Sequence, residues 1–533
     1  MMEEKQSGYV MPENVSRTIG REAQRNNILA AKIISDIVKT TLGPKGMDKM
    51  LVDSSGNITI TNDGVTILQE MEIDHPAAKM IVEIAKTQED EVGDGTTTAA
   101  LLVGKLLENA EKLLDRKIHP TLIVKGYKMA AEKSREILDE ISLPLSDRNI
   151  LNQIAMTAMT GKGAEGSREK LSELIVGAVD IVSSGKNISA EDIKIQKVKG
   201  DELGESELIK GFVFDKERAN VDMPTQLKNA KILLVDFPIE LKSPETETRI
   251  SISTPEQLES FVSSEERYLK DLTAKIVSSG ANALFCQKGI DDVAQYYLAK
   301  AGIFACRRVS RSDMEKIARA TSGKIISNMN DIKENDFGFA GIVEEIRKGD
   351  ESLIYIKECK NPKTVTIIVK GSSSHSLDET ERAIKDGLGD VISAVKSGKV
   401  VPGGGAVEVE LSKRLRAYAK TIGGREQLAI DEFANSLESV PETLAENAGL
   451  DPIDTLTELK RRHEAGSARD GLNLLKDKIE DTFNAGIIEP LKVKLQALQS
   501  ASEVAQMILR IDDVLVSKGS LQKSQQNSYE GMD

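Results

Sequence analysis

The sequence predicts a multidomain α + α/β protein in which one mainly helical domain, formed from both chain ends, carries an inserted α/β domain. The chain has 533 residues, of which 40% are hydrophobic, so it is too long for a single core. Helical periodicity dominates from about residue 15 to residue 144 and returns after Gly403, whereas residues 210–370 contain short apolar runs typical of strands. An insertion of the middle into one helical domain explains why the two ends resemble each other.

The first block opens with an amphipathic helix and a hairpin. NNILAAKIISDIVKTTLG repeats apolar residues at helical spacing and stops at Gly43-Pro44. Its apolar positions are Ile28, Leu29, Ile33, Ile34, Ile37 and Val38. In SSGNITITNDGVTIL, apolar residues alternate on both sides of Asn62-Asp63-Gly64, which predicts a hairpin with Asp63 in a tight turn. A further helix is predicted from Pro120 to Ile141.

The stretch EVGDGTTTAALLVGK, residues 91–105, raises the question of how its helix starts. A Gly-Asp-Gly triplet runs through three threonines into small and aliphatic residues. A glycine lets the backbone approach a ligand closely, and a helix start offers unpaired N–H groups and positive potential. The stretch therefore predicts either a phosphate-binding helix start or an ordinary capped helix.

The middle of the chain predicts an α/β layer domain. KILLVDF, NALFCQ, IFACRRV and TVTIIVK are short apolar runs, and helical patterns such as IDDVAQYYLAKAG fall between some of them. A charged helix in this block carries an interrupted apolar stripe, which either packs on its own domain or contacts a partner. The stripe comprises Leu258, Phe261, Val262, Leu269, Leu272 and Ile276. At the far end of the chain, the polar residues 518–533 predict disorder.

Composition narrows the classes of function. The formal net charge is −14 and no dense Lys/Arg block with interleaved aromatics occurs, so nucleic acid is not expected as a partner. No apolar run approaches 18 residues, and the start MMEEKQSGYV lacks the apolar core of a signal peptide. We therefore expect a cytoplasmic protein without a membrane partner.

The cysteines and histidines do not predict a metal site. Cys286, Cys306 and Cys359 have neither a disulfide framework nor metal-ligand spacing, so we expect them to be buried small hydrophobic residues. The four histidines are scattered, and none lies in an HExxH motif. A metal ion is therefore expected to be held by oxygen atoms.

Familiar nucleotide and catalytic motifs are missing from the sequence. No GxxxxGK[ST] occurs, which argues against a P-loop NTPase. A GxGxxG match at residues 161–166 follows ILNQIAMTAMT, which predicts helix rather than strand, so it lacks the context of a dinucleotide fingerprint. No GxSxG elbow or protein-kinase motif set appears either.

A dispersed set of glycine turns and acids remains. It consists of LGPKG (42–46), TNDG (61–64), GDGTTT (93–98), PGGG (402–405) and Asp386. The helix that carries Asp386 is predicted to start with the capping-box spacing of Ser376 and Glu379. Its apolar stripe comprises Leu377, Ile384, Leu388, Val391 and Val395. Asp386 lies off this stripe, so its position alone predicts an exposed surface acid.

Six motifs, taken in their order, strongly resemble those of the group II chaperonins, the thermosome type of archaea and its eukaryotic cytosolic relatives. They are LGPKGMDKML, TNDGVTIL, VGDGTTTAALL, GFVFDK, VVPGGGAVEVEL and GIIEPLKVK, and the resemblance runs from about residue 10 to residue 515. It implies an ATP-dependent molecular chaperone that forms a double ring of eight or nine subunits per ring. Its partners would be other chaperonin subunits and the non-native client proteins that the ring encloses.

The resemblance also implies three domains. An equatorial ATP-binding domain would comprise residues 1–145 and 403–533, and a hinge-like intermediate domain residues 146–216 and 370–402. An apical α/β domain would comprise residues 217–369. A helical protrusion of the apical domain, at about residues 242–279, would serve as a built-in lid.

For the site, the resemblance implies ATP and Mg²⁺, with Asp94 holding the metal between nucleotide oxygens. The residues implied to contact the nucleotide are Leu42, Gly43 and Pro44 in a facing loop, Gly95, Thr96, Thr97 and Thr98 at the phosphates, Gly404 at the ribose and Glu489 at the nucleoside end. Lys45 would add positive charge nearby.

Hydrolysis requires an oriented water, and the resemblance implies that Asp63 and Asp386 hold it as catalytic carboxylates. Lys162, in the loop Thr160-Gly161-Lys162, would contact the γ-phosphate. Because Asp386 would belong to the intermediate domain, chemistry would be coupled to a movement of that domain.

Two other classes of function stay open at this point. A small-molecule kinase with a non-P-loop site would need a defined acceptor pocket and would form only a small oligomer. A non-catalytic ring or filament scaffold would leave Asp63, Asp94 and Asp386 as incidental surface acids.

Overall fold

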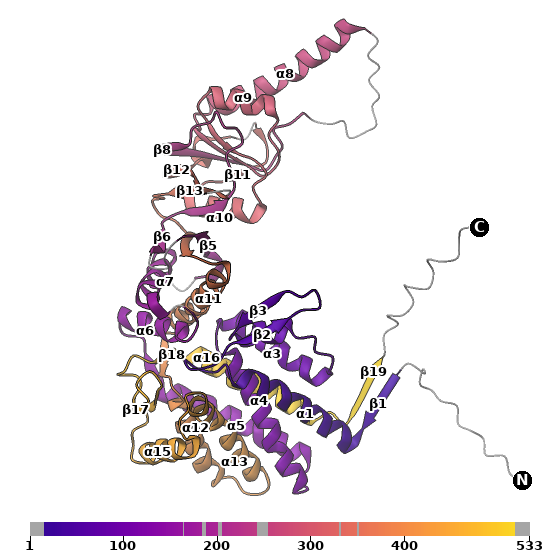
Figure 1. Cartoon of the computed structure of the whole chain (residues 1–533), viewed down its shortest axis with the longest axis vertical. Helices are drawn as coiled ribbons and strands as arrows, with labels where there is room; N and C mark the ends of the chain where they lie inside the picture. The colour runs from indigo at the N-terminus through magenta and orange to yellow at the C-terminus, as the bar shows by residue number, and fades with distance from the viewer. Residues whose placement is uncertain are drawn as a thin grey trace, which may run out of the picture. The chain divides into compact units, whose positions relative to one another are not determined.

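The computed structural model describes residues 15–163, 165–183, 188–200, 205–241, 254–329, 332–348 and 351–517 (Figure 1). The chain divides into two compact units. The first unit is Met1–Ser146 with Ser397–Asp533, and the second unit is Asp147–Lys396. The tail 518–533, expected to be disordered, and residues 242–253 of the expected protrusion lie outside the described residues.

The first unit is mainly helical. Its helices are α1 (Gly20–Lys39), α2 (Gly64–Glu70), α3 (Pro76–Val92), α4 (Thr96–Asp115), α5 (Pro120–Ile141), α12 (Ala406–Ala419), α13 (Glu426–Leu437), α14 (Ser439–Asn447), α15 (Pro452–Glu464) and α16 (Leu491–Leu509). Its strands are β1 (Val15–Ile19), β2 (Lys49–Val52), β3 (Ile58–Thr61), β4 (Leu143–Pro144), β15 (Lys399–Pro402), β16 (Asp470–Asn473), β17 (Lys478–Asp481), β18 (Ile488–Pro490) and β19 (Asp513–Ser517). The expected helix from Pro120 to Ile141 is confirmed as α5.

Short antiparallel sheets join distant parts of this unit. Strand β1 pairs with β19, so that Val15 lies opposite Ser517. Strand β15 lies between β4 and β18, whereas β2 pairs with β3 and β16 with β17. The segments before Ser146 and after Ser397 therefore share two of these sheets, β1–β19 and β4–β15–β18, and one hydrophobic core.

Helix α4 is the centre of the first unit. It packs against α1, α3, α13 and α16, and residues on all of its sides are buried. A helix that is enclosed in this way must be apolar around its whole circumference, which accounts for the small and aliphatic residues after Thr98. Gly104 marks the tightest crossing, because a Cβ atom there would lie 2.2 Å from Cβ of Ser35 in α1.

The second unit contains a large mixed sheet, a small sheet and their covering helices. Its helices are α6 (Arg148–Met159), α7 (Arg168–Val182), α8 (Pro255–Ser278), α9 (Asp292–Lys300), α10 (Arg311–Thr321) and α11 (Ser374–Ser397), with short 3₁₀ turns at Glu165–Ser167, Ala190–Asp192 and Glu334–Asp336. Its strands are β5 (Ile193–Lys199), β6 (Glu207–Ile209), β7 (Phe212–Asp215), β8 (Gln226–Val235), β9 (Ala283–Cys286), β10 (Phe304–Cys306), β11 (Ile325–Ile326), β12 (Gly338–Lys348), β13 (Glu351–Lys357) and β14 (Val365–Gly371).

The large sheet confirms the expected α/β layer. Within the described residues its strand order is β10-β9-β8-β12-β13-β7, with β11 parallel to the end of β8. Alternate residues of β8 serve two cores: Ile232 and Leu234 pack with residues of α10, and Leu233 and Val235 pack with residues of α8 and α9. Helices therefore cover both faces of the sheet (Figure 1).

Two further expectations concern strand β14 and the apolar stripe of α8. The run TVTIIVK is a strand, β14, but it pairs with β5 and β6 in a separate three-stranded sheet and not in the large one. The part of the apolar stripe at Leu269, Leu272 and Ile276 packs into the core of its own domain. The side chains of the other members, Leu258, Phe261 and Val262, lie outside the described residues.

The three cysteines are buried and free, as expected. Burial raises the pKa of the thiols of Cys286, Cys306 and Cys359 to about 12. They therefore stay protonated and behave as small hydrophobic residues. None of the described helices combines the length and the apolar character needed to cross a bilayer.

One expectation for the first unit is wrong. The hairpin turn lies at residues 53–57, where Asp53 accepts hydrogen bonds from the backbone N–H groups of Ser55 and Asn57 (2.8 Å each), and not at Asn62-Asp63-Gly64. Gly64 begins helix α2 instead, because the Asp63 carboxylate caps it. In α1, Leu29 and Ile33 are exposed, since only one face of that helix meets α3 and α4.

The crossing of α1 and α4 generates a test of the packing. We expect Gly104→Ala to lower the free energy of unfolding by about 1–3 kcal/mol, because the added methyl group forces the helices apart. Far-UV circular dichroism in urea measures this change. The matched control is Gly177→Ala in α7, where the nearest atom would lie 3.4 Å away and helix propensity improves. Equal stability of the two variants would show that the crossing is not tight.

Candidate nucleotide-binding site

The site in the first unit is built around the start of α4. Helix α3 ends at Gly93 and α4 begins after Gly95, both with φ of 82°, so Asp94 stands alone between two left-handed glycines. As the N-cap residue, Gly95 has no side chain that could accept hydrogen bonds from the first-turn N–H groups. Thr96, Thr97 and Thr98 form this first turn. The arrangement presents N–H groups, hydroxyl groups and the positive end of a buried helix at one place, which suits an anion.

A second turn lies directly against this helix start. The Asp63 carboxylate caps α2 by accepting hydrogen bonds from Thr66 N (2.8 Å) and Thr66 Oγ1 (2.6 Å), both at Oδ2. At Gly64, a Cβ atom would lie 2.6 Å from Thr97 Oγ1 and 3.3 Å from Thr97 N. The close approach of Gly64 therefore places the Asp63 carboxylate beside the helix start that the sequence singled out.

The PGGG loop is a rigid wall of the same region. Gly404 has a φ of 65°, and a Cβ atom there would lie 2.4 Å from the carbonyl oxygen of Leu472. Leu472 N donates to Gly404 O (2.8 Å), and Thr482 Oγ1 donates to Gly403 O (3.0 Å). Only glycine permits this contact, so the loop before α12 is held in one conformation by the β16–β17 hairpin.

The loop that contains Leu42, Gly43 and Pro44 packs on neighbouring elements. Gly43 has a φ of 84°, and a Cβ atom there would lie 2.5 Å from Cδ2 of Leu444 in α14. Asn447 Nδ2 donates to Leu42 O (2.9 Å). Lys45 forms an ion pair with Asp477 (2.5 Å) in the turn between β16 and β17, so its charge is already shared with a carboxylate.

The first turn of α16, which we call the floor of the site, connects the GDG turn with the residues around the PGGG loop. Gln88 Nε2 donates to Asp94 O (2.8 Å) and to Val493 O (3.3 Å), which ties the GDG turn to α16. Lys494, the next residue of α16, pairs with Glu489 (2.8 Å) of β18 and with Glu408 (2.9 Å) of α12. Burial raises the pKa of Glu489, with the nearby negative charges of Glu408 and Asp94 adding to the effect. The pKa of Lys494 is also raised, because the two carboxylates outweigh the effect of burial.

The predicted residues of the second unit lie together as well. Helix α6 ends at Met159, and the following loop places Lys162 Nζ 2.5 Å from Asp386 Oδ2 in α11. Thr160 accepts a hydrogen bond from Arg168 Nη1 (2.8 Å), and Gly161 has a φ of 82°. In this structure the Asp386 carboxylate is therefore bound to the lysine that was expected to contact a phosphate.

The expectation that Asp386 is an exposed surface acid is wrong, because the residue is only 6% exposed. The neighbouring Gly387 allows α11 to lie close to α6 and α7: a Cβ atom there would be 2.9 Å from Ile175 Cδ1 and 3.6 Å from Met159 Cγ. The helix also begins earlier than expected, at Ser374 rather than Ser376, with Ser373 Oγ accepting from Ser376 N (3.2 Å).

Three residues of the floor escaped the sequence prediction: Gln88, Glu408 and Lys494. Two of them stood inside the quoted motifs VVPGGGAVEVEL and GIIEPLKVK. Glu408 and Lys494 could have been identified from the sequence, because each is a charged residue among apolar ones at the start of a helix. Gln88 lies near the C-terminal end of α3 and carries no such signal.

The donor set of the first unit fits a magnesium–nucleotide complex. Its N–H and hydroxyl donors suit phosphate oxygens, and the carboxylate of Asp94 suits a hard cation. No group of three His, Cys, Asp or Glu residues is placed for metal binding in the described parts of the chain. Mg²⁺ at Asp94 would therefore take its other ligands from phosphate and water, as this ion usually does.

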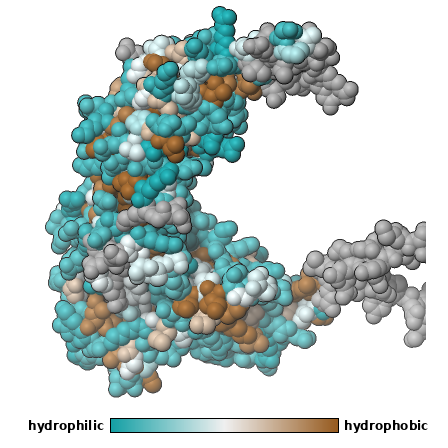
Figure 2. Space-filling model, turned by 45° about the horizontal axis from the view of Figure 1, so that its top comes forward, coloured by the Kyte–Doolittle hydropathy of each residue, from teal (hydrophilic) through white to brown (hydrophobic). Residues whose placement is uncertain are grey.

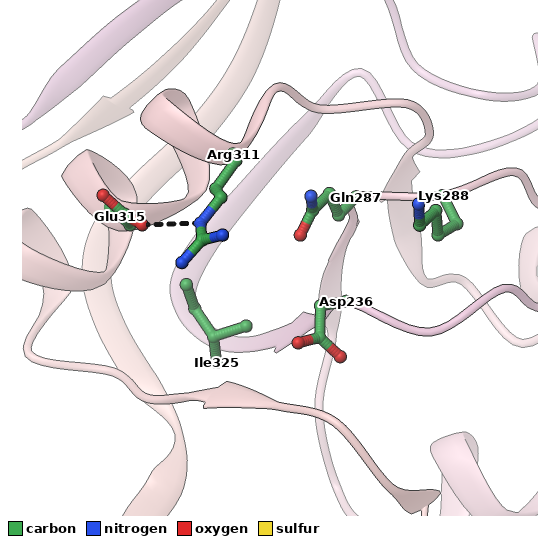
Figure 3. Close-up of a pocket in the computed structure, with 6 residues that line it drawn as sticks. All are labelled: Asp236, Gln287, Lys288, Arg311, Glu315 and Ile325. Atoms are coloured by element: carbon green, nitrogen blue, oxygen red, sulfur yellow. Dashed lines mark hydrogen bonds and ion pairs between the residues drawn. The ribbon is translucent and has the colours of Figure 1, made fainter.

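A separate cavity of about 430 Å³ lies in the second unit, at the carboxyl ends of β8 and β9 (Figure 3). It is lined by Asp236, Gln287, Lys288, Arg311, Glu315 and Ile325, and Arg311 pairs with Glu315 (3.0 Å). Its lining holds two cations and two carboxylates, and the start of α10 is capped by Ser310, whose Oγ accepts from Asp313 N (3.1 Å). Because its positive and negative groups are equal in number, this cavity suits a polyphosphate less well than the glycine-capped start of α4 does.

Comparison with known proteins identifies the family of the chain. The family model described as the TCP-1/cpn60 chaperonin family matches residues 34–519. The chain is 54% identical to thermosome subunit beta of Methanothermobacter thermautotrophicus over 533 residues, covering 100% of this chain and 98% of that protein. It is 53% identical to thermosome subunit beta of Archaeoglobus fulgidus (98% and 97% covered) and 53% identical to the thermosome subunit of Methanopyrus kandleri (96% and 94% covered).

With the family model matching most of its length and these relatives aligned almost end to end, the chain belongs to the TCP-1/cpn60 chaperonin family, in the thermosome group of ATP-dependent double-ring chaperones.

Proposed function

We propose that this chain hydrolyses ATP at the start of α4 and uses the cycle to close a double ring over non-native proteins. The observation that carries the proposal is the glycine-capped start of a helix whose first half is enclosed by other helices, with the Asp63 turn against it. Family membership supports neither alternative that the sequence left open, a small-molecule kinase or a non-catalytic scaffold.

In this proposal the nucleotide lies across the floor formed by α16. Thr96, Thr97 and Thr98 donate to the phosphates, and Asp94 holds Mg²⁺, which neutralises phosphate charge. Gly404 and Glu489 contact the nucleoside end, and the loop of Leu42, Gly43 and Pro44 closes the opposite side. The rigid packing of both glycine loops supports these roles, because fixed donors lose little entropy on binding.

Hydrolysis requires groups from both units. Asp63 and Asp386 orient the attacking water, and Lys162 contacts the γ-phosphate. Lys162 is paired with Asp386 in the present structure, so we propose that it exchanges this carboxylate for the phosphate when ATP binds. Asp386 is then able to accept a hydrogen bond from water, and the exchange is coupled to a movement of the second unit.

We further propose the division into equatorial, intermediate and apical domains, with the protrusion at residues 242–279 as a lid. Helix α8 supports this role in part, because its second half is anchored in the core by Leu269 and Ile276. A lid needs such a fixed base.

Assembly into rings is supported by two exposed β elements of the first unit. Hydrophobic patches interrupt a largely hydrophilic surface on the face drawn in Figure 2. The β2–β3 hairpin exposes Met50, Val52 and Ile58, and the β1–β19 pair exposes Ile19 and Leu515. Two-stranded sheets with free edges are poorly stable alone. We propose that the hairpin of one subunit extends the β1–β19 sheet of the next, a head-to-tail contact that closes a ring of eight or nine subunits.

The catalytic role of Asp386 is tested by Asp386→Ala. We expect ATP binding to stay within about twofold of the wild type and phosphate release to fall by about 100-fold or more, because a water-orienting carboxylate is removed. Equilibrium ATP binding and phosphate release measure the two effects. Asp378→Asn, on the exposed face of the same helix, is the control and should retain turnover. Undiminished turnover by Asp386→Ala would contradict the assignment.

The assembly contact is tested by the double variant Val52→Lys/Ile58→Lys. These residues are a cross-strand pair that is 63% and 62% exposed, so the charges should spare the fold and prevent docking of a neighbour. We expect particle mass, measured by light scattering, to fall from that of a double ring to that of single subunits. Val221→Lys, an exposed position of the second unit, should keep the ring intact. A double variant that still forms rings would refute the proposed contact.

A further inference from the structure

Beneath the proposed nucleotide site, one lysine is paired with two carboxyl groups. Lys494 is a single cation between two carboxylates, and its side chain is only 10% exposed. Glu408 lies in the first turn of α12, directly after the PGGG loop, and its Oε2 atom accepts no hydrogen bond from the described residues. The cluster of Glu408, Glu489 and Lys494 therefore contains two carboxyl groups and one ammonium group in a place where charge is costly.

Stability alone does not account for this cluster. A buried ion pair is often no more stable than well-packed apolar residues of the same volume, so its presence at one position calls for another reason. Geometry supplies one, because Glu489 Oε2 is held by Lys494 while its Oε1 lies against the PGGG loop: a Cβ atom on Gly403 would be 2.7 Å from Oε1. Lys494 thus fixes which way the Glu489 carboxylate faces.

The same helix turn also reaches the phosphate end of the site. Val493 precedes Lys494, and its carbonyl oxygen accepts from Gln88 Nε2, which also donates to Asp94 O. A Cβ atom on Gly95 would lie 2.9 Å from Val493 Cγ1. The start of α16 therefore touches the GDG turn through Val493 and holds the Glu489 carboxylate through Lys494.

We propose that Lys494 is a positioning residue for the nucleoside end of the site, acting through Glu489. Its ammonium group holds Oε2 of Glu489 and directs Oε1 along the PGGG loop, so that Glu489 can accept a hydrogen bond from a hydroxyl or amino group of the nucleoside. Glu408 holds the second side of the ammonium group and keeps it in place. This inference rests on the proposed function, because it requires ATP to bind at the start of α4.

The test compares two ligands that share phosphates and differ in the nucleoside: Mg-ATP and magnesium tripolyphosphate. Lys494→Met keeps the length of the side chain and removes its charge. We expect its dissociation constant for Mg-ATP to rise about tenfold or more, the loss typical of a hydrogen bond to a charged group, and that for tripolyphosphate to change less than about twofold. Lys494→Arg should restore part of the ATP affinity.

A second variant separates positioning from simple charge balance. Lys494→Met/Glu408→Gln returns the cluster to its original net charge without restoring the ammonium group that holds Glu489. We expect its ATP affinity to stay low although its thermal stability recovers. Lys492→Met, on the exposed face of the same helix turn, should bind both ligands as the wild type does.

The outcomes are distinct. Recovery of ATP affinity in the double variant, or equal weakening of ATP and tripolyphosphate by Lys494→Met, would overturn the positioning role while leaving the proposed ATP site intact. If the wild type bound neither ligand, the proposed function itself would fail and the inference with it.

Discussion

The burial of α4 is the constraint on which the rest of the first unit depends. Because α1, α3, α13 and α16 enclose this helix, neither its axis nor its first turn can shift without disturbing the whole core. The N–H groups after Gly95 are therefore presented at fixed positions. Fixed donors aimed at developing charge are an efficient form of electrostatic stabilisation, since no reorganisation is needed when the ligand reacts. The apolar sequence that follows the threonines thus fixes the position of the helix start, where we propose that ATP binds.

Each of the two units contains a lysine that is paired with buried carboxylates. In the first unit, Lys494 is shared between two carboxylates below the nucleoside end. In the second unit, Lys162 is paired with Asp386, which is almost fully buried. A buried ion pair that loses one partner is costly unless another charge replaces it. In the proposed cycle the γ-phosphate would replace Asp386 at Lys162, and this exchange of partners would link ATP binding to movement of the second unit.

Much of the fold was predictable, because long helices and buried strands leave clear periodicities. The α5 helix from Pro120 to Ile141 and strands β8, β9 and β10 of the large sheet follow directly from such patterns. Local alternatives were less predictable. Asp63 and Gly64 form a sequence that suits a hairpin turn and a helix cap equally well, and the choice depends on the contact of Gly64 with α4. The sequence of strand β14 resembles the sequences of strands in the large sheet, and only its pairing with β5 and β6 shows that it belongs to another sheet.

The candidate site also has parts that the sequence predicted and parts that it did not. Glycine turns and acids identified the walls around α4, because those residue types have special backbone or charge requirements. The burial of Asp386 could not be predicted from its own helix, since it depends on the packing of α6 and α7 around Gly387. Lys494 resembled any lysine of an amphipathic helix until the structure placed it between Glu408 and Glu489.

The most direct test of the central claim is a structure of the assembled protein with Mg²⁺ and a non-hydrolysable ATP analogue. We predict phosphate oxygens within hydrogen-bond distance of the N–H groups of Thr96, Thr97 and Thr98, a metal ion at Asp94, and Lys162 released from Asp386. Nucleotide bound in the cavity near Asp236 and Arg311, with the start of α4 empty, would contradict the account.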